Sequence, residues 1–339
     1  MSEKLKFVVV GCGHIGKRHV KVIQQNENAQ LVAICDISEG QMDSLNDIPQ
    51  SVARFESYED MLATTAFDVV CICTPHALHA EMSILAAKSN KHILVEKPMA
   101  LSSAASAKMI EEAKNHGVKL YVVKQNRYNT PIYLTTEAIK KGKLGRVFMV
   151  QCNVMWNRNN AYYEQSSWRG KKQSEGGALF TQVSHFLDLL VWWFGSIEEA
   201  KTILDTLNHD IEIEDCGSSS LRFESGVIGS LLWTNCVYNA NYEGSITIVA
   251  EKGTIKIGGK YLNEIEHWDV ESYPIPHDVE FDDEPNSYGS YKGSSSNHDK
   301  LMDELVIQII EDRKGVVEGE EGIKSIQAIE KIYEETKMK

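Results

Sequence analysis

The feature that most constrains this chain is a glycine-rich stretch between an apolar strand and a helix. Residues 5–10 form an apolar run, and Gly11-Cys12-Gly13-His14-Ile15-Gly16 follows at once, with a helix-like stretch over 17–25. In this context the first glycine permits the turn, the second lets the backbone approach a pyrophosphate, and the third lets the helix pack on the strand. The stretch predicts a dinucleotide site, because free N–H groups and the dipole of a helix N-terminus favour a pyrophosphate.

An acidic residue at the end of the next strand strengthens this prediction. Residues 31–35 form a second apolar run that ends in Asp36. A carboxylate at this point binds the adenosine ribose hydroxyls and repels a 2′-phosphate. Ile37 and Ser38 follow, where a site for NADP often carries arginine. We therefore predict NAD as the cofactor. The alternative is a tight turn followed by a surface acid.

Strand-like and helix-like segments alternate over the first 124 residues. The expected strands 5–10, 31–35, 68–73, 92–95 and 119–123 alternate with expected helices over 17–25, 58–63, 79–89 and 102–116. Such alternation is typical of a parallel, doubly wound α/β sheet.

One of these strands ends in a charged pair. The run His92-Ile93-Leu94-Val95 passes directly into Glu96-Lys97-Pro98. Open α/β sheets bind ligands at the carboxyl ends of their strands. Lysine can carry a proton there, since desolvation or a nearby cation lowers its pKa towards neutrality. We predict that Lys97 is catalytic and that Glu96 orients it; a solvated ion pair at a strand end is the alternative.

After residue 124 the pattern changes. Strand-like runs over 147–155, 217–223, 227–235, 245–250 and 254–257 follow one another, most of them without intervening helices. This pattern favours a largely antiparallel, open sheet in an α+β domain. We predict a dinucleotide-binding domain over 1–124 and a substrate-binding and oligomerisation domain over 125–339, whose C-terminal helix is free to pack back on the first domain.

A basic and aromatic region lies within the second domain. Trp156-Asn157-Arg158, Tyr162-Tyr163 and Trp168-Arg169-Gly170-Lys171-Lys172 precede Gly176-Gly177 and a helix-like stretch. Helical spacing puts Thr181, His185 and Asp188 on one face. His185 is a second candidate for proton transfer, although a histidine on an apolar helix is often structural.

Composition narrows the functional class. Forty-eight acidic against 35 basic residues give a net charge of −13, which argues against nucleic-acid or anionic-membrane partners. No apolar run approaches the ~20 residues of a membrane span, and the first residues lead directly into a strand, so we expect a cytoplasmic protein. The seven cysteines include no C-x-x-C pair, and His76 and His79 lack an acidic third ligand, so we predict no metal.

Together these motifs resemble the glucose-fructose oxidoreductase/inositol dehydrogenase family over essentially the whole chain. The resemblance implies that Lys97 and His185 flank the substrate carbon facing the nicotinamide, that the Lys97–Pro98 peptide is commonly cis, and that the open sheet makes oligomer contacts. Many members carry an aspartate four residues before the histidine, where this chain has Thr181. This departure leaves proton transfer to Lys97 and His185.

Finer details resemble one group of the family, the UDP-N-acetyl-2-amino-2-deoxyglucuronate 3-dehydrogenases. These enzymes oxidise the sugar C3 hydroxyl to a ketone, in the biosynthesis of lipopolysaccharide and other surface-polysaccharide sugars. A diphosphate and a uronate need fixed cations, and aromatic rings can stack on uracil or the pyranose. The matching segments are 124–129, 156–158, 162–163, 168–170 and 177–179, together with Gln182 and His185.

The candidate site follows from the motifs and the resemblance. The catalytic candidates are Lys97 and His185. The cofactor-binding candidates are Gly11, Gly13, His14, Ile15, Gly16, Asp36, Thr74, Pro75, His79, Glu96, Lys97, Gln125, Trp168 and Arg169. The substrate-binding candidates are Lys97, Arg127, Tyr128, Asn157, Arg158, Tyr162, Tyr163, Thr181, Gln182 and His185.

We therefore expect an NAD-dependent dehydrogenase that acts on a UDP-sugar and forms a homo-oligomer, either a dimer or a tetramer. Use of 2-oxoglutarate to recycle bound NADH, known for some members of the group, stays open. An inositol or simple-sugar dehydrogenase is the alternative within the class, disfavoured by Thr181 and the basic-aromatic region. A non-catalytic NAD-binding regulator is the alternative of another class, disfavoured by the intact Glu96-Lys97-Pro98 and His185.

Overall fold

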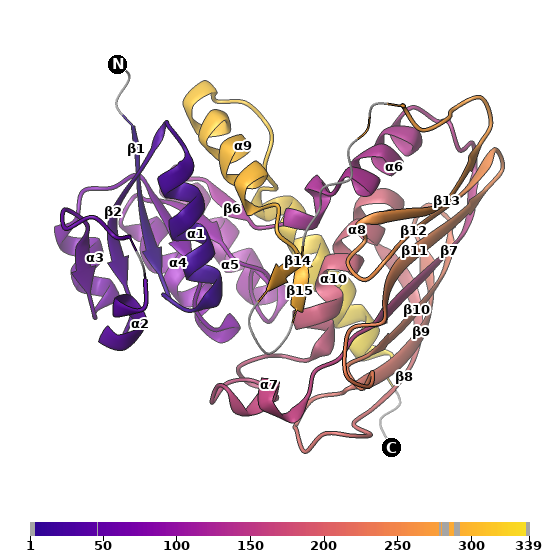
Figure 1. The fold of residues 1–339 in the computed structure, drawn as a ribbon, viewed down its shortest axis with the longest axis horizontal. Helices are drawn as coiled ribbons and strands as arrows, with labels where there is room; N and C mark the ends of the chain where they lie inside the picture. The colour runs from indigo at the N-terminus through magenta and orange to yellow at the C-terminus, as the bar shows by residue number, and fades with distance from the viewer. Residues whose placement is uncertain (1–3, 46, 278, 280–284, 288–291, 337–339) are drawn as a thin grey trace. The chain divides into compact units, whose positions relative to one another are not determined.

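The computed structural model describes residues 4–336 except 46, 278, 280–284 and 288–291 (Figure 1). The chain divides into two compact units, one made of residues 1–124 and 298–323, the other of 125–297 and 324–339. The predicted domain boundary at residue 124 placed residues 298–323 in the second domain. The structure groups them with the first unit instead. No helix in the described ranges has the length and apolar character needed to cross a membrane.

The first unit contains a six-stranded parallel sheet in the order β3-β2-β1-β4-β5-β6. The order reverses between β1 and β4, which is the switch point where such sheets bind ligands. The inner strands are short Val, Ile and Leu runs with almost no exposed surface, as expected for a parallel sheet covered on both faces. The strands are β1 (Leu5–Val10), β2 (Ala29–Cys35), β3 (Ala53–Phe55), β4 (Val69–Ile72), β5 (His92–Val95) and β6 (Leu120–Val122).

Helices connect these strands and cover the sheet. α1 packs on β1 and β2, and α9, from the far end of the sequence, packs on α1. Ser57 and Ser102 cap α3 and α5 by accepting a backbone N–H with their side chains. The helices are α1 (His14–Gln25), α2 (Glu39–Asp43), α3 (Tyr58–Thr64), η1 (His76–Leu78), α4 (His79–Lys88), α5 (Ser103–Asn115), α9 (His298–Glu311) and α10 (Gly319–Glu334), which continues into the second unit.

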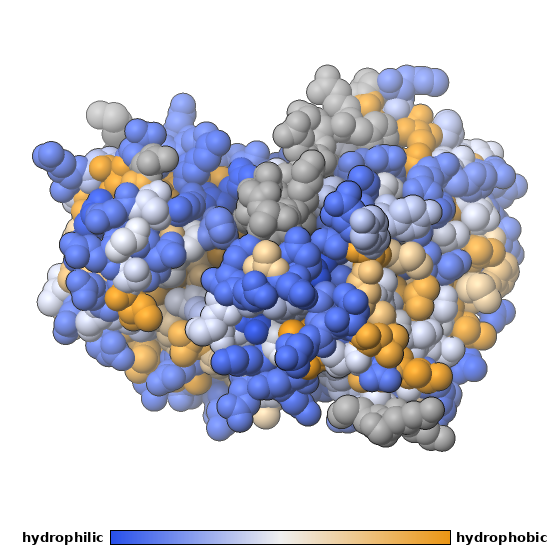
Figure 2. All heavy atoms as spheres, turned by 60° about the horizontal axis from the view of Figure 1, so that its bottom comes forward, coloured by the Kyte–Doolittle hydropathy of each residue, from blue (hydrophilic) through white to orange (hydrophobic). Residues whose placement is uncertain are grey.

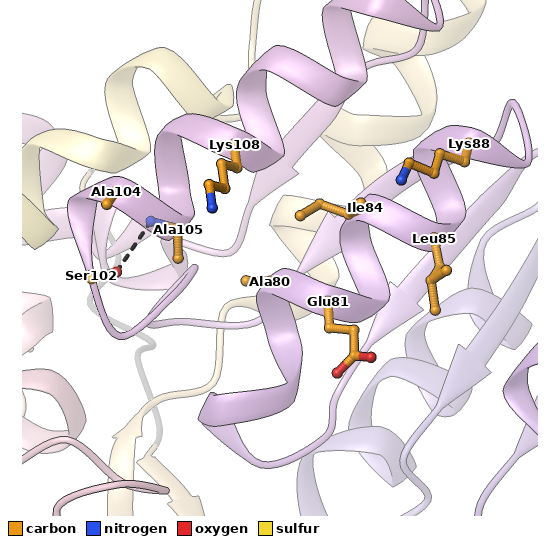
Figure 3. A pocket seen from close by; sticks show the side chains of 9 residues that line it. All are labelled: Ala80, Glu81, Ile84, Leu85, Lys88, Ser102, Ala104, Ala105 and Lys108. Atoms are coloured by element: carbon orange, nitrogen blue, oxygen red, sulfur yellow. Dashed lines mark hydrogen bonds between the residues drawn. The ribbon is translucent and has the colours of Figure 1, made fainter.

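An open pocket lies between α4 and α5 (Figure 3). Ile84 and Leu85 of α4 and Ala105 of α5 give it an apolar lining, with Lys88 and Lys108 beside them. None of the candidate site residues lines this pocket.

The second unit is built on a seven-stranded sheet in the order β13-β12-β11-β7-β10-β9-β8. All pairs are antiparallel except β7 with β10. The predicted fold class, a Rossmann-type sheet plus an α+β domain with a mostly antiparallel sheet, is confirmed. The strands are β7 (Val147–Met155), β8 (Ile197–Asp205), β9 (Cys216–Phe223), β10 (Ile228–Thr234), β11 (Glu243–Ala250), β12 (Gly253–Gly258) and β13 (Glu264–Val270), and β14 (Pro285–Ser287) pairs with β15 (Lys292–Ser295).

One face of this sheet is open. Met149, Ile228 and Val249 are register partners on neighbouring strands, and all three are exposed. Hydrophobic side chains likewise interrupt the polar surface of the second unit in Figure 2. The helical segments of this unit are η2 (Gln125–Tyr128), α6 (Thr130–Lys140), α7 (Asn160–Glu164), η3 (Leu179–Val183) and α8 (Ser184–Phe194).

Candidate active site

Two glycines of the turn, Gly11 and Gly16, lie where a side chain would not fit. Gly11 has φ +88°, and a Cβ on it would lie 2.6 Å from the carbonyl oxygen of Cys73. A Cβ on Gly16 would lie 1.9 Å from the Gly11 carbonyl oxygen, so this glycine lets α1 approach the turn. A Cβ on Gly13 would meet nothing within 4 Å, and α1 begins at the next residue. An open approach to a helix N-terminus fits a dinucleotide pyrophosphate.

Asp36 holds the same turn. Its Oδ2 accepts the N–H of Cys12 at 2.7 Å, and its Oδ1 accepts the N–H of Ser38 at 2.9 Å. The carboxylate is half-buried, whereas the neighbouring Ile37 is 91% exposed. The acid thus lies at the glycine turn, as a ribose-binding residue requires, while its contact with the ribose stays a prediction.

The strand β5 delivers Glu96 into a buried cluster. Glu96 Oε1 lies 2.8 Å from His19 Nε2 and 3.3 Å from His298 Nε2, and all three side chains are buried. Its Oε2 accepts the N–H of Lys97 at 3.1 Å. Burial alone would raise the pKa of Glu96, but the hydrogen bonds from the two imidazoles hold it well below its usual range. Glu96 is therefore an anchored carboxylate, and sequence reasoning missed both histidines.

On the C-terminal side of Lys97, His79 contacts the backbone of Pro98. His79 Nδ1 lies 2.7 Å from the carbonyl oxygen of Pro98, and its Nε2 lies 2.9 Å from that of Thr74. The ring is fully buried, and this burial lowers the pKa of His79. Both ring nitrogens thus face backbone, so His79 joins the ends of β4 and β5. Lys97 is half-buried, and the Lys97–Pro98 peptide is cis.

The remaining cofactor candidates of the first unit follow β1 and β4 in the sequence. Ile15, Thr74 and Pro75 are partly exposed and His14 is exposed, at the ends of β1 and β4. Their contacts with a dinucleotide stay predictions.

In the second unit, Gly177 opens the helix that carries His185. It has φ +141°, and a Cβ on it would lie 2.0 Å from Tyr333 Oη. Glu214 Oε1 accepts the Tyr333 hydroxyl at 2.7 Å and the Leu179 N–H at 3.2 Å. Burial raises the pKa of Glu214 to about 7. Neither Glu214 nor Tyr333 had been singled out from the sequence.

The first turn of this helix is a π-helix over Leu179–Val183, followed by α8. Thr181 Oγ1 donates to Glu175 Oε1 at 3.0 Å, and Glu175 is fully buried. His185 is 6% exposed. The structure therefore places a carboxylate beside Thr181, the position where many relatives carry aspartate, and this carboxylate comes from Glu175.

Asp188, on the same helix, forms a two-point ion pair. Arg127 Nε lies 2.7 Å from Asp188 Oδ2, and Arg127 Nη2 lies 3.1 Å from Oδ1. The guanidinium also lies over the Trp192 ring, 4.3 Å from its centroid. The charge of Arg127 is thus largely compensated within the unit, and its role in substrate binding stays a prediction.

Tyr162 and Tyr163 join a buried polar network. Gln182 Nε2 donates to Tyr162 Oη at 3.1 Å, and Asn235 Nδ2 lies 3.2 Å from Tyr163 Oη and 3.3 Å from Gln182 Oε1. The two tyrosine rings meet edge to face, with centroids 5.0 Å apart. This network brings together three of the predicted substrate residues and adds Asn235, which sequence reasoning missed.

Two guanidinium groups lie over the Tyr162 ring. Arg169 is 4.0 Å from the ring centroid and Arg158 is 5.2 Å from it. Arg158 Nη1 also donates to the carbonyl oxygen of Asn157 at 2.6 Å and to Asn241 Oδ1 at 3.2 Å. Trp168 lies beside Arg169, 5.5 Å from its guanidinium. The structure therefore gathers Asn157, Arg158, Tyr162, Tyr163, Trp168, Arg169 and Gln182. Gln125 and Tyr128 belong to η2, and their roles stay predictions.

Two clusters among the described residues have the composition of a metal site. They are His19, Glu96 and His298, and His209, Asp215 and Cys236. Both carboxylates are hydrogen-bonded. Glu96 contacts the two imidazoles as described above. Asp215 Oδ2 accepts the Asn208 and His209 N–H groups and lies 2.9 Å from His209 Nδ1.

Domain models of one family match both units. The model described as "Oxidoreductase family, NAD-binding Rossmann fold" matches residues 5–124, and the "GFO/IDH/MocA C-terminal domain" matches residues 134–256. The chain belongs to the GFO/IDH/MocA oxidoreductase family. It is an NAD-dependent dehydrogenase, and the predicted cofactor is thereby confirmed.

Solved structures of GFO/IDH/MocA proteins give a closer comparison. The WlbA dehydrogenase from Bordetella pertussis, in complex with NADH and UDP-GlcNAcA, is 36% identical over 98% of this chain and 96% of that chain, with a TM-score of 0.89. The WlbA dehydrogenase from Chromobacterium violaceum, in complex with the same two ligands, is 34% identical over 99% and 94%, also with a TM-score of 0.89. The 2,7-anhydro-N-acetylneuraminate hydratase of Escherichia coli is 26% identical over 78% of this chain and 73% of its own length.

Proposed function

We propose that the enzyme oxidises the C3 hydroxyl of a UDP-N-acetylamino-uronic acid to a ketone with NAD⁺, in the biosynthesis of a surface-polysaccharide sugar. The observation that carries the proposal is the similarity, along nearly the full chain, to two dehydrogenases crystallised with NADH and UDP-GlcNAcA. Both exceed 30% identity, whereas the hydratase relative is more distant.

The chemistry of the second unit supports this substrate class. A nucleotide sugar presents a diphosphate, a uronate carboxylate and two ring systems. Arg158 and Arg169 lie over the Tyr162 ring and offer planar, charge-bearing donors for oxygen anions. The chain as a whole is acidic, with a net charge of −13, so local cations are needed to bind such an anion.

A side chain of the enzyme accepts the proton of the substrate hydroxyl. NAD⁺, when bound, supplies the acceptor for the hydride from the sugar carbon. Lys97 or His185 takes the hydroxyl proton, directly or through a water. The buried anchors on Glu96 and Pro98 fix the backbone on either side of Lys97, which limits the positions that its amine can reach.

Thr181 favours this proposal over an inositol or simple-sugar dehydrogenase, because many members of the family carry an aspartate at this position. The Thr181 hydroxyl donates a hydrogen bond to Glu175 Oε1, so the carboxylate at this point belongs to Glu175.

The test is a screen of UDP-sugars and free sugars with NAD⁺, followed by absorbance at 340 nm and by mass spectrometry of the product. We expect UDP-GlcNAcA to lose two hydrogen atoms and free inositol or glucose to remain unchanged. The screen is run with and without 2-oxoglutarate, so that tightly held NADH does not mask turnover. Oxidation of free sugars alone would refute the proposal.

Loss of the proposed base tests the mechanism. Lys97→Ala should lower kcat by ~10²–10⁴-fold, the usual contribution of a positioned acid–base group. Lys108→Ala, on α5 beside the α4–α5 pocket, is the matched control and should keep wild-type turnover. If Lys97→Ala keeps more than about a tenth of wild-type kcat, its catalytic role is wrong.

We also propose that the open sheet face binds a second copy of the chain in a dimer or tetramer. The exposed row of Met149, Ile228 and Val249 supports this, because flat apolar sheet faces are usually covered.

A further inference from the structure

Two cysteines of the second unit lie in contact. Cys216 is the first residue of β9 and is the register partner of Thr234, the last residue of β10. Cys236 follows Thr234 by two residues, and its Sγ is 3.6 Å from Cys216 Sγ. Both are partly exposed, while the other five cysteines are buried. A disulfide would require the sulfurs to approach by roughly 1.5 Å, to the usual S–S length of about 2.05 Å.

The surroundings of Cys236 keep its thiol protonated at neutral pH. Burial, reinforced by the Cys216 thiol and the Asp215 carboxylate, raises the pKa of Cys236 to about 12, although a hydrogen bond with Thr234 acts in the opposite direction. Its thiol also contacts the Asp215 carbonyl oxygen, with Sγ and O 3.7 Å apart. At neutral pH Cys236 is therefore a poor first nucleophile.

Cys216 has a hydroxyl beside its sulfur. Thr234 Oγ1 lies 2.9 Å from Cys216 Sγ and accepts the Cys236 N–H at 3.0 Å. At this distance the Thr234 hydroxyl can donate its proton to a sulfur anion on Cys216. Cys216 is thus the thiol placed to react first, and Cys236 is placed to resolve it.

We propose that Cys216 and Cys236 form a reversible disulfide and that this disulfide lowers substrate turnover. The oxidant is hydrogen peroxide. The Cys216 thiolate attacks one peroxide oxygen, the O–O bond breaks, and a sulfenic acid forms with release of water once the leaving oxygen is protonated. The Cys236 sulfur then attacks the sulfenic sulfur, the S–O bond breaks, and a second water leaves. Two thiols lose two electrons, and hydrogen peroxide is reduced to two waters.

The Cys216–Cys236 disulfide would affect the proposed substrate-binding residues through Asn235. The Asn235 carbonyl oxygen accepts the Arg158 N–H at 2.8 Å, and its side chain reaches Tyr163 and Gln182. Since Asn235 precedes Cys236 directly, drawing Cys236 towards Cys216 displaces the residue that holds these three. This part of the inference rests on the proposed function, whereas formation of the disulfide does not.

The first experiment maps the bond. The purified full chain is treated with hydrogen peroxide, alkylated, digested without reduction and analysed by mass spectrometry. We expect a linked peptide pair containing Cys216 and Cys236 that disappears after dithiothreitol, with the five buried cysteines alkylated only after unfolding. Absence of this pair would overturn the proposal. A mixture of ¹⁵N-labelled and unlabelled chains should give no mixed pairs, and mixed pairs would likewise overturn it.

The second experiment tests the order and the effect. Cys236→Ser should accumulate a dimedone-trapped sulfenic acid on Cys216, and Cys216→Ser should not accumulate one on Cys236; the reverse would overturn the assigned order. Oxidation should lower kcat/KM for UDP-GlcNAcA several-fold in the wild type, reversibly, and not in Cys216→Ser. A fully linked enzyme with unchanged kinetics would overturn the effect on turnover. Absence of activity in the reduced enzyme counts against the proposed substrate, not against the disulfide.

Discussion

The buried carboxyl of Glu214 should make the stability of the second unit depend on pH. Its side chain is 6% exposed and its pKa is raised by burial to about 7, against an ordinary value of 4.5. The folded state therefore holds this proton more tightly than the unfolded chain does. The stabilisation is complete below pH 4.5 and is lost as the pH rises through 7. One proton contributes about 1.4 kcal/mol per pH unit, so about 3 kcal/mol is lost over this range.

Glu214→Gln should remove this dependence. The amide keeps an oxygen to accept the Tyr333 hydroxyl and the Leu179 N–H, and it is neutral at every pH. Any unpaired amide hydrogen adds a constant cost of about 1–3 kcal/mol, which shifts the curve without changing its slope. The difference in unfolding free energy between wild type and variant should therefore move by about 3 kcal/mol in favour of the variant between pH 4.5 and 7.5.

The assay is urea unfolding followed by tryptophan fluorescence from pH 4.5 to 8. All six tryptophans lie between residues 156 and 268, so the signal reports the second unit alone. The exposed Glu212, two residues away, supplies the matched control Glu212→Gln, which should follow wild type. Tyr333→Phe removes a donor that lowers the Glu214 pKa and should move the inflection to higher pH. A difference between wild type and Glu214→Gln that stays flat within about 0.5 kcal/mol would refute the reasoning.

Three further outcomes are expected. Gly177→Ala, with φ +141° and no room for a Cβ, should lose at least about 2 kcal/mol in the fluorescence assay, whereas Gly226→Ala, at φ +82° in open space, should lose only about 1 kcal/mol; equal losses would contradict the steric argument. Asp36→Ala combined with Ile37→Arg should raise the NADP/NAD ratio of kcat/KM at least tenfold, since the ribose acid is replaced by a phosphate-binding cation, and an unchanged ratio would count against the role of Asp36. Met149→Lys should reduce the mass measured by light scattering towards that of a monomer; an unaltered oligomer would place the interface elsewhere.

Local patterns predict the first unit well. The glycine turn, the acid at the end of β2 and the alternation of apolar runs with helices lie within short stretches of sequence, and each constrains its own neighbourhood. The second unit was harder. Its β8 has the sequence IEEAKTILD, rich in helix formers, and becomes a strand because it pairs along its length with β9. Its β13, EIEHWDV, is mostly polar and exposed, which hides the alternation of a strand.

The candidate site likewise contains residues that local patterns predicted and residues that they did not. The motifs singled out Lys97, His185 and the Tyr162-Tyr163 pair, because their residue types and spacing carry chemical meaning. The residues that hold them did not stand out, since each is an ordinary residue made important by a distant partner. Glu175 reaches Thr181 across the two-glycine turn, and His298 reaches Glu96 over 202 positions of sequence. Such pairings are set by topology, which a local pattern does not contain.

The return of residues 298–323 to the first unit means that the cofactor half of this enzyme cannot be cut out as one continuous piece. A fragment ending at residue 124 would keep every dinucleotide motif, yet Glu96 would lose the imidazole of His298 and the Val122 N–H would lose the Val317 carbonyl. A truncation before residue 298 would therefore remove part of the first unit, and each of the two units needs two separate segments of the sequence to be whole.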